Sequence, residues 1–369
     1  MANPTAHADN ITMSGGGVYS LATIGAKDVI DLATPRVLNA IETMRTARAS
    51  DDLHWCFSDM GCADGGTSLD LWRAVIAKLR ENDTRDIQIV YADQANNDFN
   101  ALVKILHGLT EFKSYLPQSE NVRILESGAS FYTPILPSNS LDLGFSATAM
   151  HWLSALPCEI SDHVHMVGAS GVERETFAAQ AASDWQTILL RRAREMRSGA
   201  KLVLVNFCTD EEGRYLGNTG SINMFERFNQ NWQGLLDQST INADEYKAMT
   251  LPQYYNSVEE FSAPLLDTSS DVYAAGLRLT DIETAIVPCP FAADFKKHGD
   301  AKRFADAYLP TIRTWNESTF AGGLNPSRSI EERRELIEHY YGLYHQDVEA
   351  QPDGHGMDYV HAYMTIEKI

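Results

Sequence analysis

Alternation of strand-like and helix-like segments over the first half of the chain is the feature that most constrains its fold. Short apolar runs alternate with stretches whose apolar residues recur at helical spacing. The strand-like runs are residues 55–61, 86–93, 141–150 and 200–207, and the helix-like stretches are residues 67–82, 96–109 and 178–199, the last expected to end at Gly199. This order predicts an α/β fold, with a parallel sheet covered by helices on both faces.

The second half of the chain changes character after Phe207. Residues 209–275 are polar and helical in pattern, with the interruption LPQYY, whereas LRLTDIETAIVP and the final DYVHAYMTIEKI are strand-like. Ligands of open α/β sheets bind at the carboxyl ends of the strands. We therefore expect a Rossmann-like core with a helical cap at that end. The expected division is an N-terminal arm and active-site segment (1–34), a core (35–208, completed by 276–290 and 333–369) and a cap (209–275 and 291–332).

Charge and cysteine content limit the partners and the compartment. The 369 residues include 30 basic and 50 acidic side chains, a formal charge of −20, with no Lys- or Arg-rich run. Nucleic acids and anionic membranes need basic surfaces, so neither is an expected partner. Five scattered cysteines predict buried free thiols in a reducing compartment. Because no apolar stretch reaches membrane length either, we expect a cytoplasmic protein.

The loop SDMGCADGGTSLDLW follows the first strand-like run. Gly61, Gly65 and Gly66 allow a tight turn and close approach of a ligand to the backbone. Their spacing, GxxxGG, differs from the GxGxxG of dinucleotide sites. Asp59 precedes the glycines, where a carboxylate would repel a pyrophosphate but attract a cation. The loop therefore favours a sulfonium-bearing, amino-acid-like cofactor over a nicotinamide dinucleotide.

Asp93 ends the second strand-like run, in YADQANNDFN. A carboxylate there suits two hydrogen bonds from ribose hydroxyls. Nicotinamide enzymes and S-adenosylmethionine enzymes share this feature, so Asp93 alone does not choose between them.

Several motifs together resemble those of one family. They occur in order along the chain as MSGGGVYS, DMGCADGGT, ADQANNDFN, GASFYTPILP, SATAMHWLSALP, SGAKLVLVNF and LPQYY. In this order they resemble the salicylic acid, benzoic acid and theobromine (SABATH) methyltransferases. Shortened loops suggest a microbial or fungal member.

The resemblance implies an S-adenosylmethionine-dependent O-methyltransferase that yields S-adenosylhomocysteine and a methyl ester. Its expected acceptors are small, aromatic mono- or dicarboxylic acids, and it implies a homodimer. The residues it assigns to the cofactor are Tyr19, Thr23, Asp59, Gly61, Asp93, Gln94, Ser130 and Phe131. Those it assigns to the acceptor are His151 and Trp152, with Trp232 and Tyr254 as further walls from the cap.

The chain departs from the family at two places. A glutamine that often helps to hold the acceptor carboxylate falls here on Gly25 or Ala26. The usual Leu-Pro after the ribose aspartate is Gln94-Ala95. The first departure leaves the acceptor-binding mode open, and the second can change the adenine pocket.

The expected chemistry needs positioning rather than an acid or a base. A carboxylate with a pKa of about 4 is already ionised at neutral pH. Methyl transfer then requires alignment in a dry site, so we expect hydrogen-bond donors and aromatic walls. His151 is a candidate donor or cation, whereas Arg191, Arg192 and Arg194 are expected to face solvent.

No metal site is expected. The histidines His339, His345, His355 and His361 match no common zinc spacing, and solvated positions are the expectation for them. The aromatic stripe HYYGLYHQ is typical of a core or an interface.

Three alternatives stay open at this point. A methyltransferase acting on a ring nitrogen is the nearest, because the motifs name the donor better than the acceptor. A nicotinamide oxidoreductase is disfavoured by the absent GxGxxG and by Asp59. A non-catalytic relative that keeps the fold is the third.

Overall fold

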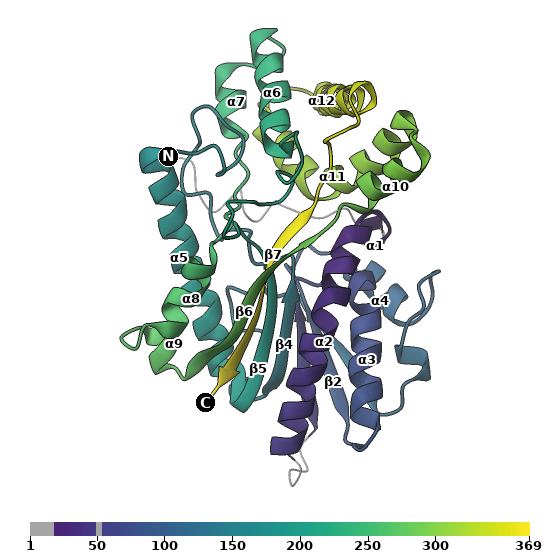
Figure 1. The fold of residues 1–369 in the computed structure, drawn as a ribbon, viewed down its shortest axis with the longest axis vertical. Coiled ribbons are helices and arrows are strands. Elements are labelled where there is room, and N and C mark those ends of the chain that lie inside the picture. Colours follow the sequence, from purple (N-terminus) through teal and green to yellow (C-terminus); the bar gives the residue numbers. More distant parts are fainter. Residues whose placement is uncertain (1–17, 49–53) are drawn as a thin grey trace.

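The computed structural model describes residues 18–48 and 54–369, which form one seven-stranded sheet with helices on both faces (Figure 1). The strand order is β3-β2-β1-β4-β5-β7-β6. The strands are β1 (Trp55–Met60), β2 (Ile87–Ala92), β3 (Val122–Ser127), β4 (Leu141–Ala147), β5 (Met196–Phe207), β6 (Leu277–Val287) and β7 (Tyr359–Lys368). The first five are parallel, and β7 runs antiparallel to both β5 and β6. The predicted α/β class and Rossmann-like sheet are confirmed.

Two helical layers cover the sheet (Figure 1). One core contains residues of α2 (Ile24–Ala47), α3 (Leu69–Arg80) and α4 (Phe99–Leu106). The other contains residues of α5 (Gly171–Glu195), α8 (Val258–Leu266) and α9 (Asp271–Ala274). Because both faces are covered, all six residues of β1 are buried, which is why the central strands read as continuous apolar runs.

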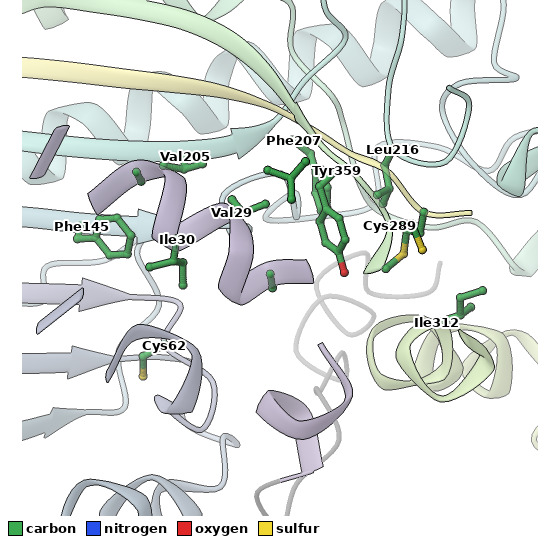
Figure 2. Packing of buried hydrophobic residues seen from close by; sticks show 14 of the residues in the cluster. Val29, Ile30, Cys62, Phe145, Val205, Phe207, Leu216, Cys289, Ile312 and Tyr359 are labelled. Atoms are coloured by element: carbon green, nitrogen blue, oxygen red, sulfur yellow. The ribbon is translucent and has the colours of Figure 1, made fainter. Parts of the chain in front are cut away.

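Helix α2 shows how sequence periodicity produces this packing. Its buried residues include Val29, Ala33, Val37, Ala40 and Met44, which recur at the three- and four-residue spacing of one helix face. Figure 2 shows Val29 and Ile30 beside Phe145 of β4, in the core between helix and sheet.

The cap lies beyond the carboxyl ends of the parallel strands (Figure 1). Its helices are α6 (Met224–Asp237), α7 (Ala243–Ala248), α10 (Pro290–His298), α11 (Ala301–Gly323) and α12 (Ile330–Ala350). Short elements complete the chain: α1 (Val18–Ala22) and the single turns η3 (Gly66–Ser68) and η4 (Leu116–Gln118). The rings of Tyr340, Tyr341 and Tyr344 on α12 are buried, so the aromatic stripe is part of the core, one of its two predicted places.

The expected segment boundaries differ from the packing in three places. Helix α2 is continuous across the boundary placed after residue 34. Helices α8 and α9 pack on α5 and β6, so they cover the sheet rather than the acceptor end. Helix α12 packs on α6 and α11 and therefore belongs with the cap, although residues 333–369 were assigned to the core.

Two local predictions were wrong. Helix α5 ends at Glu195, and Gly199, which has φ +79°, lies inside β5 where the register to β4 shifts. His355 and His361 are buried rather than solvated. His355 packs against Tyr344 of α12, and His361 lies on β7, inside the sheet, against Phe207 of β5. His339 is exposed, as expected, and His345 is half-buried.

Within residues 18–48 and 54–369, no helix is long and apolar enough to cross a membrane. Nor do three or more His, Cys, Asp or Glu side chains gather there as metal ligands would. All five cysteines are free, and all but Cys158 are buried.

Candidate active site

A cavity of about 670 Å³ lies between the carboxyl ends of the parallel strands and the cap. Its lining comes from α1 and α2, from the segments that follow β1, β2, β3 and β4, from the end of β5 and from the cap. Nine of the ten residues predicted for cofactor and acceptor on the core side line it: Tyr19, Thr23, Gly61, Asp93, Gln94, Ser130, Phe131, His151 and Trp152. The remaining one, Asp59, lines a smaller pocket behind it.

The glycine loop after β1 brings backbone to the cavity. Gly61 and Gly65 have φ of +77° and +72°, values that favour glycine. A Cβ on Gly61 would come within 2.3 Å of the Cβ of Ala149. The loop therefore needs glycine at residue 61 both for its conformation and for its closeness to the segment after β4.

Each carboxylate oxygen of Asp93 accepts one backbone hydrogen bond and can accept another. The backbone N–H of Ala63 donates to Oδ2 and that of Gln94 donates to Oδ1, each at 2.7 Å. Burial raises the pKa of Asp93, and these two hydrogen bonds oppose that effect. Each oxygen retains a further lone pair, so the carboxylate is oriented to accept from two neighbouring hydroxyls, as a ribose presents them.

Asp59 lies deeper than predicted. Its Oδ2 accepts from Ser68 Oγ at 2.6 Å and from Trp72 Nε1 at 2.9 Å. It lines a pocket of about 20 Å³ that shares Tyr19 and Gly61 with the main cavity. Burial raises the pKa of Asp59 to about 6. The position suits a small cationic group next to the main cavity.

The segment around Tyr19 is fixed to the glycine loop by a residue that sequence reasoning missed. Asp64 accepts from the backbone N–H of Ser20 at 3.0 Å and from the Ser20 hydroxyl. Thr23 Oγ1 donates to the Tyr19 carbonyl at 2.7 Å, which turns the chain from α1 into α2. The sequence shows an acidic residue, Asp64, in the CADGG loop, but it does not show that its partner is the distant Ser20.

The loop that carries Ser130 and Phe131 is held by a buried cation, which corrects the expectation that Arg192 faces solvent. Arg192 is fully buried. It donates to the carbonyls of Phe131 at 3.2 Å and Thr133 at 2.9 Å and pairs with Glu195 at 2.8 Å. The Arg192–Glu195 pair thus positions the loop after β3, which lines the cavity.

His151 and Trp152 lie side by side in the part of the cavity wall predicted to bind the acceptor, with ring centroids 5.5 Å apart. The His151 ring also contacts Phe207 and Tyr255, at 4.8 and 5.9 Å. Burial lowers the pKa of His151 to about 3. His151 is therefore neutral at physiological pH, which leaves it the role of donor and removes that of cation.

The structure does not place Trp232 or Tyr254 on the cavity wall. Trp232 is fully buried in the cap, against Phe320 and Tyr340. Tyr254 points the other way, donating to Glu260 at 2.8 Å. The roles predicted for these two residues as acceptor walls are thus not supported by their positions.

Residues 252–254 pair with residues 151–153 as a short antiparallel bridge, with Trp152 opposite Gln253. Successive side chains of an extended segment point to opposite sides. Gln253 and Tyr255, which flank Tyr254, therefore reach the cavity in its place. The LPQYY motif therefore does line the cavity, but through Gln253 and Tyr255 rather than the predicted Tyr254.

Other residues of this part of the cavity wall come from distant segments and were not predicted. They are Phe207, Leu216, Trp315, Met357 and Tyr359. Tyr359 stacks on Phe207, with centroids 6.0 Å apart and ring planes at 18°. Figure 2 shows the Tyr359 ring close to the N-terminal end of α2. A Cβ on Gly25 would come within 2.2 Å of this ring, so glycine there makes room for Tyr359.

A strand-end carboxylate, a glycine loop and a capped, ring-lined cavity define a Rossmann-like fold of the methyltransferase type. The sequence model of the family described as "SAM dependent carboxyl methyltransferase" matches residues 10–271. The chain belongs to this family, which confirms the SABATH resemblance.

Relatives in sequence come from plants and fungi. Indole-3-acetate O-methyltransferase 1 of Oryza sativa subsp. japonica is 25% identical over 258 residues, 61% of this chain and 63% of the relative. Methyltransferase LUC1 of Fusarium sp is 30% identical over 213 residues, 57% of this chain and 55% of the relative. The chain thus spans between half and two thirds of the length of these relatives.

A solved structure agrees over nearly the whole chain. Loganic acid methyltransferase with SAH superposes with a TM-score of 0.75 at 20% identity, covering 96% of this chain and 98% of that one. At this identity the likeness supports the fold, cap included.

Proposed function

We propose that the protein transfers a methyl group from S-adenosylmethionine to a carboxylate oxygen of a small acid, releasing S-adenosylhomocysteine and a methyl ester. The observation that carries the proposal is one continuous cavity with two different ends. Asp93 and the glycine loop lie at one end, and His151, Trp152 and Phe207 lie at the other.

The residues at the first end fit the cofactor. Asp93 would accept from the ribose hydroxyls, with Gln94, Ser130 and Phe131 beside the adenosine. Gly61 and Tyr19 would line the amino-acid part, and Asp59 supplies negative charge behind them. Bound there, the cofactor supplies an electrophilic methyl group on a positively charged sulfur.

The residues at the second end suit an ionised acid. As the acceptor oxygen bonds to the methyl carbon, the carbon–sulfur bond breaks and its electron pair stays on sulfur, so no proton moves. The chain's task is to align the carboxylate and exclude water. The buried rings of His151, Phe207 and Tyr255 do this without a general base.

The relatives support an acid as the acceptor. They include methyltransferases named for indole-3-acetate, loganic acid and farnesoic acid, the last two from Catharanthus roseus and Arabidopsis thaliana. We infer from the ring-lined cavity that the acceptor here has an aromatic or otherwise apolar body.

Incubation with methyl-labelled S-adenosylmethionine and a panel of carboxylic acids tests the proposal. We expect labelled products that release methanol in mild alkali, as esters do. A product stable to alkali would instead indicate methylation of a ring nitrogen. Absence of labelled product from every acid of the panel would contradict the proposal.

We further infer a cytoplasmic homodimer without nucleic-acid or membrane partners. The family resemblance supports the dimer, and the charge of −20 and the free cysteines support the rest. Light scattering during size-exclusion chromatography is expected to give twice the chain mass of 41.0 kDa. A monomer mass at micromolar concentration would contradict the dimer.

A further inference from the structure

Three buried polar groups at the acceptor end of the cavity lack a hydrogen-bond partner among the described residues: Nδ1 of His151, Nε2 of Gln253 and the hydroxyl of Tyr359. The ring nitrogen of His151 can donate or accept according to the tautomer, whereas the Gln253 nitrogen and the Tyr359 hydroxyl carry protons to donate. Gln253 and Tyr359 both line the cavity, and their exposed fractions are 0% and 2%. A buried donor without a partner is destabilising, so such groups in a cavity point to a ligand that satisfies them.

Neighbouring side chains fix the orientation of the Gln253 amide. The Tyr255 hydroxyl donates to its Oε1 at 3.2 Å. Burial lowers the pKa of nearby His165, and Gln253 opposes this, as an amide oxygen does beside an imidazole. With its oxygen engaged on this side, the amide presents its nitrogen as the free donor. Gln253 lies directly opposite Trp152 in the bridge, so this donor is next to the predicted acceptor wall.

The Tyr359 ring occupies the room that Gly25 leaves. Gly25 is one of the two positions where the family's carboxylate-binding glutamine was expected, and any side chain there would collide with Tyr359. Stacking on Phe207 holds the ring at the acceptor end. A donor lost from α2 is thus matched by a donor gained from β7.

Charge at this end of the cavity is low. Among the described residues that line it, there is no Lys or Arg, and Asp93 at the cofactor end is the one acid. His151 is neutral at physiological pH. A single acceptor carboxylate has its counter-charge in the sulfonium of the methyl donor, whereas a second carboxylate would be buried among rings without a cation.

We propose that the Gln253 amide and the Tyr359 hydroxyl hold the acceptor carboxylate in place of the missing glutamine, and that the site selects acids with one carboxylate on an apolar body. The inference rests on the proposed function. It assigns carboxylate binding to two residues of the cap and β7 and excludes dicarboxylic acids as good acceptors.

Matched acceptors test the selectivity. Phenylacetate, 4-carboxyphenylacetate and methyl 4-(carboxymethyl)benzoate share one ring, and the last two are similar in size but differ in charge. We expect kcat/KM for the diacid to be at least about 100-fold below that for the ester, because the second carboxylate has no partner. Equal values for the diacid and the ester would overturn the selectivity.

Variants test the two donors. Tyr359→Phe and Gln253→Met are each expected to raise the KM for phenylacetate and indole-3-acetate about 10- to 100-fold, since each removes a hydrogen bond to a charged group. Gln253→Glu is expected to be worse than Gln253→Met, because it sets an anion against the carboxylate. Affinity for S-adenosylhomocysteine should stay unchanged in all three.

Stability separates this role from a packing role. Tyr359→Phe removes a buried hydroxyl without a partner, so its Tm should not fall. Tyr363→Phe, on the same strand but outside the cavity, is the control and should keep the wild-type KM. Wild-type KM in both Tyr359→Phe and Gln253→Met would overturn the assignment of the donors. Failure of the wild type to methylate any monoacid would instead overturn the proposed function.

Discussion

Single residues at the cofactor end combine negative charge with burial, and Asp59 makes this measurable. Burial raises the pKa of Asp59 to about 6, so the carboxylate is largely protonated below that pH and ionised above it. In the proposed function the ionised form attracts the cationic end of S-adenosylmethionine. We therefore expect affinity to rise as pH increases through about 6 and to level off above it.

Calorimetric titrations between pH 5 and 8 check this expectation. In Asp59→Asn the affinity should be lower at pH 7.5 and its dependence on pH should be flat. The same rise with pH in the variant would assign the effect to another group, and Asp59 would lose the role.

His151 gives a prediction of the opposite kind. Because burial lowers its pKa to about 3, the ring does not change charge between pH 5 and 8. His151→Phe should raise the acceptor KM by loss of a donor, yet the pH dependence of that KM should match the wild type. A KM dependence near pH 6.5 that disappears in His151→Phe would show that the ring titrates.

At the scale of elements, the buried Arg192–Glu195 pair joins α5 to the loop that carries Ser130 and Phe131. Glu195 Oε1 also accepts from the backbone N–H of Ile135 at 2.7 Å, so the pair holds both ends of that loop. Removing one partner of a buried pair costs about 3–5 kcal/mol, because the other charge is left uncompensated.

Arg192→Met is accordingly expected to lower the free energy of unfolding by that amount and to weaken cofactor binding. Urea unfolding followed by circular dichroism measures the first effect. Arg191→Met, at the neighbouring exposed position, is the control and should stay within about 0.5 kcal/mol of wild type. An equal effect of both substitutions would show that the pair has no special structural role.

At the scale of the whole molecule, two tryptophans distinguish residues that stabilise the cap from residues that line the cavity. Trp232 is fully buried among rings of the cap, and Trp152 is half-buried on the cavity. Trp232→Ala should cost about 3–5 kcal/mol of stability. At temperatures where it remains folded, its acceptor KM should be that of the wild type.

Trp152→Ala should show the reverse, with a large rise in KM and a smaller loss of stability. Thermal unfolding and steady-state kinetics on both variants decide the matter. A raised KM in Trp232→Ala with an unchanged Tm would restore Trp232 as an acceptor wall.

The sequence predicted those elements whose patterns are local and regular. Helix α3 and strand β2 follow their periodicities closely. Strand β3 was missed because VRILES lies at the sheet edge, with exposed positions occupied by Arg123 and Glu126. Helix α2 was missed because small residues and Pro35 weaken its pattern.

The site was predictable where a motif follows a strand and not where distant segments meet. Asp93 and Gly61 directly follow their strands, so their positions follow from topology. The contact of Tyr359 with Gly25 depends on how β7 enters the sheet, and no local pattern contains it. Alternate side chains of the extended LPQYY segment face the cavity. The motif alone does not show whether Gln253 or Tyr254 is on that side.

The central claim is that Asp93 binds the ribose of the methyl donor at the carboxyl edge of the sheet. Calorimetric titration of S-adenosylhomocysteine into the wild type and Asp93→Ala tests it most directly. Loss of two hydrogen bonds to a charged oxygen pair is worth about 3 kcal/mol, so we predict affinity about 100-fold weaker in the variant. Wild-type affinity in Asp93→Ala would contradict the assignment of this edge as the cofactor site.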